Sequence, residues 1–290
     1  MINPFASATN STQNTEKGIN DVQVSVGSSN IVVDGIRNVL SIPMKVILWN
    51  SSVNSGNVSV ETIEKVKEYL NENGLHDILV SVNQYKPGDV WKRTFTNPKT
   101  SRLAKLLGIP TCLMETFLFP KLTGFPGDHY NPLSNTVHLF SNDPAIALHE
   151  CGHAKDFNSR ENPTLYALSA NVPYLGSIVT LYHEYMATNN AMTYIKEKKW
   201  DTLLSHSFKV LIPAYATYCA NAVLPDVSMT RVLTTNSPEE LQSLDNDFRT
   251  YMRGMGAIVL IGHLIGRVLA AKVASKREVK ADPNLEPLPV

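Results

Sequence analysis

Short hydrophobic runs separated by Asn, Ser and Gly occupy the first half of the chain, up to residue 140. Runs of this kind that are rich in β-branched residues predict strands. The predicted strands are residues 31–33, 44–49, 77–82, 91–95 and 136–140. Residues 60–71 instead place apolar side chains at helical spacing, and Gly74 follows where a helix should stop. The mixture of patterns predicts a small α/β layer.

The hydrophobic pattern becomes almost entirely helical after residue 142. Long apolar faces predict helices at residues 144–158, 164–199, 202–223 and 238–276. The expected fold class is therefore α+β. A small α/β layer at residues 31–140, with an edge strand, packs on a predominantly helical part at residues 141–276. Residues 1–30 and 277–290 are polar or proline-rich and are predicted to be loose tails.

Three stretches of the helical half carry no charged residue: 162–182, 210–225 and 254–266. A helix needs about 20 predominantly apolar residues to cross a bilayer. The last two stretches are too short, and the first contains Asn171 and Pro173 near its middle. The first thirty residues also lack the basic and apolar regions of a signal peptide. We expect a protein that is soluble or at most peripherally attached to a membrane, with a membrane-embedded protein as the alternative.

Composition narrows the classes of partner. Lys and Arg total 26 and Asp and Glu total 26, so the formal net charge is zero. A neutral chain has no overall field that attracts polyanions, so nucleic-acid binding is not expected. The three cysteines, Cys112, Cys151 and Cys219, form no CxxC pair. This cysteine usage favours a reducing compartment over a disulfide framework, and predicts an intracellular, cytoplasmic protein.

Metal chemistry is indicated by His149-Glu150-Cys151-Gly152-His153, an HExxH motif. Residues four apart lie on the same face of a helix, so His149 and His153 can reach one ion. Two neutral imidazoles supply half of a tetrahedral Zn²⁺ shell. Glu150, one step round the helix, can take a proton from a zinc-bound water without being a ligand itself. The alternative is that two histidines share a helix face by chance.

The residues around the motif favour a helix there. Asp143 is a capping residue type, and Pro144 suits the first helical position. Gly152 in a helix interior costs about 1 kcal/mol relative to Ala. Close approach of another element would be a reason to tolerate this glycine.

The third zinc ligand must come from elsewhere in the chain, and Glu184 is the leading candidate. Ala187 and Ala191 follow it at helical spacing. These small residues would let the Glu184 helix press against the helix that carries the motif. Two alternatives are His183, which points about 100° away from Glu184 on a helix, and Asp156, which shares the face of the two motif histidines. Asp156 is more plausible as a residue that orients a ligand histidine.

The motif together with Glu184-Tyr185-Met186-Ala187-Thr188-Asn189-Asn190-Ala191 resembles the gluzincin metallopeptidases, most of all the HtpX and CAAX-endopeptidase type. The resemblance covers residues 135–194. It implies His149 and His153 as zinc ligands, Glu150 as the base and Glu184 as the third ligand. One departure is Thr188, which stands where that family has an aspartate in its second motif.

The strand expected before the motif would be an edge strand that binds substrate backbone, as in metallopeptidases of this architecture. Tyr130, just upstream, is a candidate hydroxyl donor at the mouth of the site, and a packed loop tyrosine is the alternative. Stabilising a tetrahedral oxyanion requires a further donor. The candidates from the sequence are Tyr185, His206, Tyr215, Tyr218, Arg253, His263 and Arg267.

These features together predict a metallopeptidase that holds one Zn²⁺ per chain and hydrolyses a peptide or protein substrate. The expected catalytic residue is Glu150, and the expected metal ligands are His149, His153 and Glu184. Asp156, Tyr130 and His183 are expected around the ligands or the substrate. The alternative from another class is a non-catalytic helical protein that keeps a zinc site and acts through its surface.

Overall fold

The structure of the protein is a computed structural model, and it describes residues 22–27, 31–84, 86–98, 100–102, 105–106, 109–110, 127–170, 175–224, 227, 231 and 234–281. Its strands are β1 (Gln23–Val26), β2 (Leu79–Val82), β3 (His129–Asn131) and β4 (Thr136–Leu139). Its helices are α1 (Ile31–Leu40), α2 (Ile42–Leu48), α3 (Val60–Glu72), α4 (Pro87–Thr96), α6 (Pro144–Asn158), α7 (Pro163–Ser169), α8 (Gly176–Glu197), α9 (Asp201–Val223) and α11 (Pro238–Ala281).

The strands form one mixed sheet in the order β1-β2-β4-β3. β1 and β4 both pair with β2 in parallel, and β3 pairs with β4 in antiparallel fashion. Val80 of β2 lies opposite Val137 of β4, and both side chains are fully buried. The sheet belongs to the N-terminal part and the remainder is mainly helical, so the predicted α+β class is confirmed.

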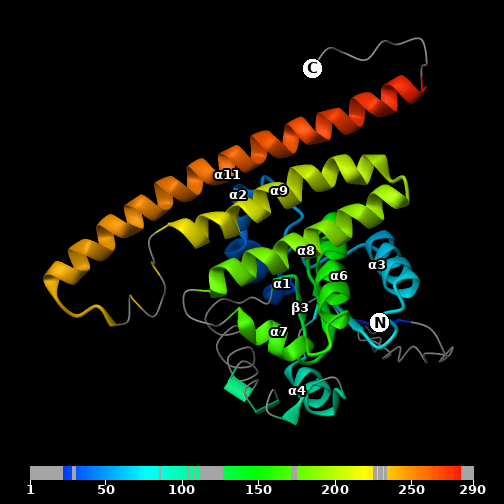
Figure 1. The fold of residues 1–290 in the computed structure, drawn as a ribbon, viewed down its shortest axis with the longest axis horizontal. Helices are drawn as coiled ribbons and strands as arrows, with labels where there is room; N and C mark the ends of the chain where they lie inside the picture. Colours follow the sequence, from blue (N-terminus) through cyan, green and yellow to red (C-terminus); the bar gives the residue numbers. More distant parts are fainter. Residues whose placement is uncertain are drawn as a thin grey trace, which may run out of the picture.

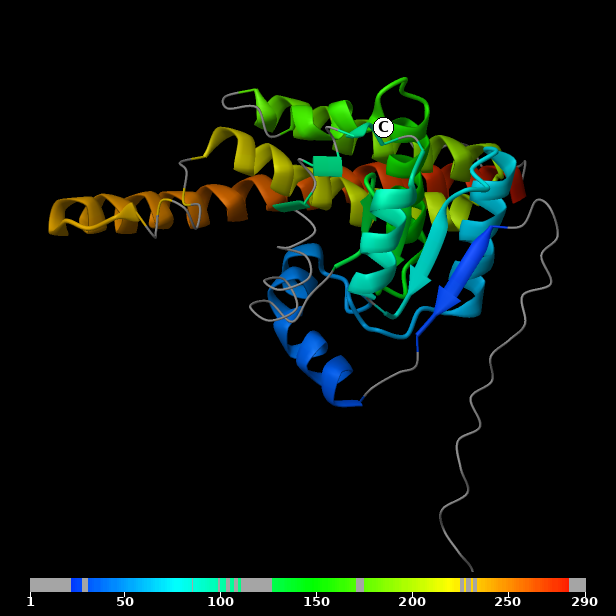
Figure 2. The same cartoon turned by 90° about the horizontal axis from the view of Figure 1, so that it is seen from below.

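Helix α6 lies between the sheet and the long helices. One hydrophobic core includes Val80 and Val137 of the sheet, Leu70 of α3, Leu148 of α6 and Ile195 of α8. Figure 1 shows α8, α9 and α11 side by side, with α6 crossing beneath them, and Figure 2 shows the blue and cyan strands β1 and β2 below these long helices. The HExxH segment is therefore held between two layers of the fold.

The start of α6 is fixed by Asp143, as the sequence predicts. The Asp143 carboxylate accepts a hydrogen bond of 2.9 Å from the backbone N–H of Ala145, and Pro144 occupies the first helical position. The other carboxylate oxygen contacts the side-chain amide of Asn50 at 2.6 Å and Nε2 of His206 at 2.8 Å. The first turn of α6 is thereby connected to the end of α2 and to α9.

Three of the predicted strands are helices in the structure. Residues 31–33 belong to α1, residues 44–49 overlap α2, and residues 91–95 belong to α4. Both α2 and α4 have a proline near their first position, which suits a helix start. Apolar runs of four to eight residues cannot be assigned to strand or helix by periodicity alone. The strand predictions at all three places are wrong, and at residues 44–49 this ambiguity of a short apolar run is the reason.

The boundaries of several other elements also differ from expectation. The strand expected at residues 136–140 is β4, but it lies inside the sheet between β2 and β3, so the edge strand before the motif is β3. The single helix expected at residues 164–199 is two helices, α7 and α8. The loose tail expected at residues 1–30 contains β1, and α11 continues to Ala281, into the tail expected from residue 277. Cys112 lies outside the described residues.

Candidate metal centre

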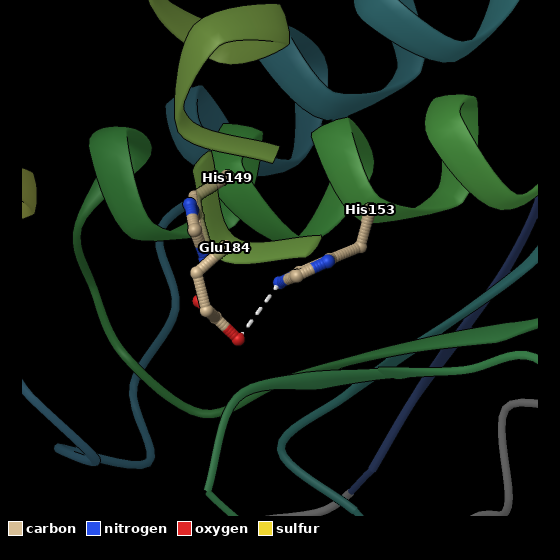
Figure 3. A group of neighbouring side chains, drawn as sticks. All are labelled: His149, His153 and Glu184. Atoms are coloured by element: carbon tan, nitrogen blue, oxygen red, sulfur yellow. Dashed lines mark hydrogen bonds and ion pairs between the residues drawn. The ribbon is translucent and has the colours of Figure 1, made fainter. Parts of the chain in front are cut away.

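His149 and His153 on α6 converge with Glu184 on α8. Nε2 of His149 lies 3.2 Å from Oε2 of Glu184, and Nε2 of His153 lies 3.5 Å from Oε1. One donor atom from each of the three residues lies within 4.8 Å of the other two. Figure 3 shows the three side chains pointing toward one another. Two imidazole nitrogens and a carboxylate oxygen in one place could hold a metal ion.

The close approach of α6 and α8 depends on Gly152. A Cβ built on Gly152 would lie 2.2 Å from the backbone oxygen of Ala187. The Asn190 side-chain amide also donates a hydrogen bond of 3.1 Å to the carbonyl oxygen of Gly152. Ala187 and Ala191 are fully buried at this contact. The expectation that Gly152 and small residues of α8 bring the two helices together is confirmed.

The charges at the three residues favour a cation. Burial raises the pKa of Glu184, but hydrogen bonds with His149 and His153 outweigh this and hold that pKa far below its usual range. Burial likewise lowers the pKa of His153, but the hydrogen bond and charge of Glu184 raise it overall. An ionised carboxylate buried against two imidazoles is therefore stabilised by positive charge. A bound dication would supply that charge to the same donor atoms.

Thr188 contacts the far side of His149. Its hydroxyl oxygen lies 3.2 Å from Nδ1 of His149, while Nε2 faces Glu184. If the imidazole proton is on Nδ1 and donates to Thr188, then Nε2 carries the lone pair that a metal requires. Thr188 stands where the gluzincins that the motif resembles have an aspartate. Its hydroxyl is placed to orient the His149 ring.

With Zn²⁺ as the probe of this candidate metal site, we expect Thr188→Val to weaken binding by about 10- to 100-fold, because such changes to residues that orient metal ligands have effects of this size. The valine side chain is close in shape to threonine but offers no acceptor to Nδ1. Thr188→Ser keeps the hydroxyl and should bind zinc nearly as the wild type does. The affinity would be measured by competition with a chromophoric chelator, and equal affinities for Val and Ser variants would contradict the role of the hydroxyl.

Glu150 lies beside the three residues without belonging to them. It is buried and lines a cavity of about 170 Å³ together with His149, Glu184 and Thr188. Burial raises the pKa of Glu150, and the neighbouring His149 and His153 only partly offset this. A carboxylate with a raised pKa, in the cavity that His149 and Glu184 also line, is suited to exchange protons with a molecule in that cavity.

Among the residues considered as oxyanion donors, Tyr215 and Tyr218 of α9 line this cavity. Burial is the main cause that raises the pKa of Tyr218, and the negative charges of Glu184 and Glu150 raise it further. Its hydroxyl is therefore neutral and can donate. The other named donors are engaged elsewhere or exposed: His206 bonds Asp143, His263 bonds the Ile47 carbonyl, Arg267 covers Trp49, and Tyr185 and Arg253 are exposed.

Asp156, His183 and Tyr130 have their described contacts outside the three donor residues. Asp156 binds Arg160 and Tyr166, at 2.6 and 2.8 Å. The His183 ring packs against Tyr166, with 4.2 Å between ring centroids. The Tyr130 hydroxyl donates to the side-chain oxygen of Asn135 at 2.7 Å. These contacts connect α6 and α8 to α7 and stabilise the β3–β4 turn.

Asp128 lines the cavity and was not identified from the sequence as a site residue. Its carboxylate accepts hydrogen bonds from the backbone N–H groups of Phe140 and Ser141 and from the Ser141 hydroxyl. Burial raises its pKa, although those hydrogen bonds lower it. Asp128 follows Pro126 and Gly127, residue types that favour turns, and this local pattern gives no reason to expect a carboxylate at a cavity.

Comparisons with protein families, curated proteins and solved structures found no family model, protein or structure that matches this chain. The resemblance to gluzincins is therefore supported by the His149, His153 and Glu184 group alone.

Proposed function

We propose that the chain is a zinc-dependent metallopeptidase of the gluzincin kind, most like the HtpX and CAAX-endopeptidase type, and that it cleaves a peptide or protein substrate. The observation that carries the proposal is the position of Glu150, which lines the same cavity as His149 and Glu184. A site that only holds a metal needs the ligands, whereas a hydrolytic site also needs a proton acceptor beside an accessible space.

The donor set fits zinc. Two histidines and one glutamate leave a fourth position of a tetrahedral shell open, which is typical of catalytic zinc sites. Among the described residues, these three form the one group of His, Cys, Asp and Glu side chains close enough to hold a metal ion. Bound Zn²⁺ supplies Lewis-acid chemistry, because it polarises a carbonyl oxygen and lowers the pKa of water.

Glu150 and Tyr218 would do the remaining chemistry. The Glu150 carboxylate takes the proton of the attacking water and passes it to the leaving amine, and its burial raises its pKa in the direction that this return step requires. The Tyr218 hydroxyl, beside Glu150 and Glu184, donates to the oxyanion that develops on the substrate carbonyl. Leu48, Ile146 and Val210 give the cavity an apolar wall that limits water around these groups.

The proposal is tested by metal content and cleavage together. Purified protein should contain one zinc per chain by elemental analysis and should cleave members of a peptide library. Removing the metal with a chelator should abolish cleavage, and added zinc should restore it. Glu184→Gln should lower zinc affinity by more than the 10- to 100-fold typical of residues that only orient ligands.

The matched control is Glu197→Gln, which changes an exposed glutamate on the same helix. It should keep both the zinc and the cleavage activity. Zinc content that survives Glu184→Gln unchanged would contradict the assignment of the third ligand. A full complement of zinc without cleavage of any library member would favour the non-catalytic alternative.

A further inference from the structure

Helix α11 exposes a row of large aliphatic side chains. The row consists of Leu260, Ile261, Leu264, Ile265 and Val268, which are between 49% and 58% exposed. Their spacing places them on one face, and the exposed Ala257 and Ala271 extend that face in both directions. Soluble proteins expose single apolar side chains commonly but contiguous apolar patches seldom, so this row indicates a surface that is covered in use.

The opposite face of α11 is fixed against α9 by glycines. A Cβ on Gly266 would lie 2.4 Å from the backbone oxygen of Phe208, and one on Gly262 would lie 2.7 Å from Cβ of Ala216. His263, on the same buried side, bonds the carbonyl oxygen of Ile47 at 2.7 Å. Since this face is tightly packed, α11 cannot turn to bury the aliphatic row within the chain.

Positive charge is concentrated in the part of α11 that carries the aliphatic row, whereas acidic residues lie nearer the ends of the helix. Residues 248–277 contain six Lys and Arg residues and no Asp or Glu, although the whole chain is neutral. Arg253 precedes the aliphatic row along the helix and Lys272 follows it, and both are exposed. Among the members of this set whose side chains the structure describes, Arg249 forms an ion pair, with Asp245 at 2.9 Å. A surface that combines aliphatic side chains with unbalanced positive charge is complementary to anionic lipid.

Trp49 extends the apolar surface from α11 to α2. It is 55% exposed, its ring stacks on His263 with 4.0 Å between ring centroids, and the Arg267 guanidinium lies over the Trp49 ring, 4.7 Å from its centroid. Tryptophan is enriched at the level of lipid headgroups, where its ring is partly apolar and its N–H remains hydrated. A tryptophan and an arginine at the border of the row suit that interfacial depth.

We propose that α11 docks the protein on the surface of an anionic lipid bilayer, with the aliphatic row inserted among the lipids and the flanking cations at the headgroups.

An 18-residue stretch of α11 has a mean hydropathy of 1.8 and is 28% buried, so by length and composition this helix could also cross a membrane. A crossing would place Arg267 and the exposed Lys209 of α9, next to Gly266, within the hydrocarbon. If a second copy of the chain covered the row instead, the cations of the two copies would lie close together and repel each other. Docking on the lipid surface avoids both this repulsion and the placing of cations in the hydrocarbon.

The test is co-sedimentation of the purified full chain with vesicles of phosphatidylcholine alone or mixed with phosphatidylglycerol. Binding should require phosphatidylglycerol and should weaken in high salt. Replacing Arg253 and Lys272 together by Gln should weaken binding about thirtyfold, since each charge contributes about 1 kcal/mol near an anionic surface. Leu260→Gln with Leu264→Gln should weaken binding at least tenfold through lost apolar insertion.

The matched control is Val60→Gln with Leu165→Gln, which changes two exposed apolar residues on α3 and α7. This variant should bind vesicles as the wild type does, and every variant should unfold at the wild-type denaturant concentration. Failure of the wild type to sediment with any vesicle would overturn the proposal. A dimer that dissociates in the Leu264→Gln variant would also overturn it, because the face would then bind a second copy of the chain. Protein that can be extracted from vesicles only with detergent would overturn it as well, because α11 would then span the bilayer.

Discussion

Replacing Glu150 by Gln is expected to lower kcat for peptide cleavage by about 10²- to 10⁴-fold while leaving zinc content and stability unchanged. Glu150 is not among the three donor residues, so the metal should be retained. Gln has the size of Glu but cannot take a proton from water at neutral pH. Cleavage would be followed by mass spectrometry of peptide products, with zinc measured in the same samples.

The control for Glu150→Gln is Glu64→Gln, the same chemical change at an exposed position of α3. This variant should cleave at the wild-type rate. If wild type and Glu150→Gln cleave the same peptides equally fast, Glu150 is not the base and the proposed chemistry is wrong. Loss of zinc in Glu150→Gln would instead mean that Glu150 supports the metal.

Replacing Gly152 by Ala should lower both the free energy of unfolding and the zinc affinity. The new methyl group would lie 2.2 Å from the backbone oxygen of Ala187, which cannot move unless α8 moves with it. Overpacking lowers the free energy of unfolding by about 1–3 kcal/mol and sometimes more, and a clash with backbone atoms belongs at the upper end of this range. The higher helix propensity of Ala stabilises the variant by about 1 kcal/mol. We expect a net loss of about 2 kcal/mol, with Glu184 displaced from the two histidines.

Gly256→Ala is the matched control for this substitution. Gly256 also lies inside a helix, but a Cβ there meets no atom within 4 Å. The variant should therefore be more stable by up to about 1 kcal/mol. Denaturant unfolding measures both changes, and zinc competition measures the second effect of Gly152→Ala. An unchanged unfolding midpoint in Gly152→Ala would contradict the close packing of α6 and α8.

The metal donors could be predicted from the sequence because their signals are local. His149 and His153 share a helix face through their spacing alone, and Asp143 with Pro144 indicates where that helix begins. Glu184 was found through the small residues Ala187 and Ala191, which permit two helices to approach. These predictions need no knowledge of how distant parts of the chain pack, and the structure brings all three donors together.

Other features depend on packing that no local pattern reveals. Residues 44–49 were predicted as a strand because they are apolar and partly β-branched, yet in α2 the apolar Val46 is exposed and Leu48 is buried. The position of β4 inside the sheet follows from its pairing with β2, across more than fifty residues of sequence. Tyr218 could not be chosen among seven donors because its place beside Glu184 depends on how α9 packs on α8.

The carboxylate of Asp143 makes the anchoring of α6 dependent on pH. The hydrogen bond with Asp143 raises the pKa of His206. Burial raises the pKa of Asp143, but its hydrogen bonds, that with His206 first, outweigh burial and lower it. The stability from Asp143 is lost as pH falls through its lowered pKa, and that from His206 is lost as pH rises through its raised pKa. The helix that carries His149 and His153 is thus held most firmly in a mildly acidic medium, and in alkali it keeps the Asp143 cap but loses its ionic link to α9.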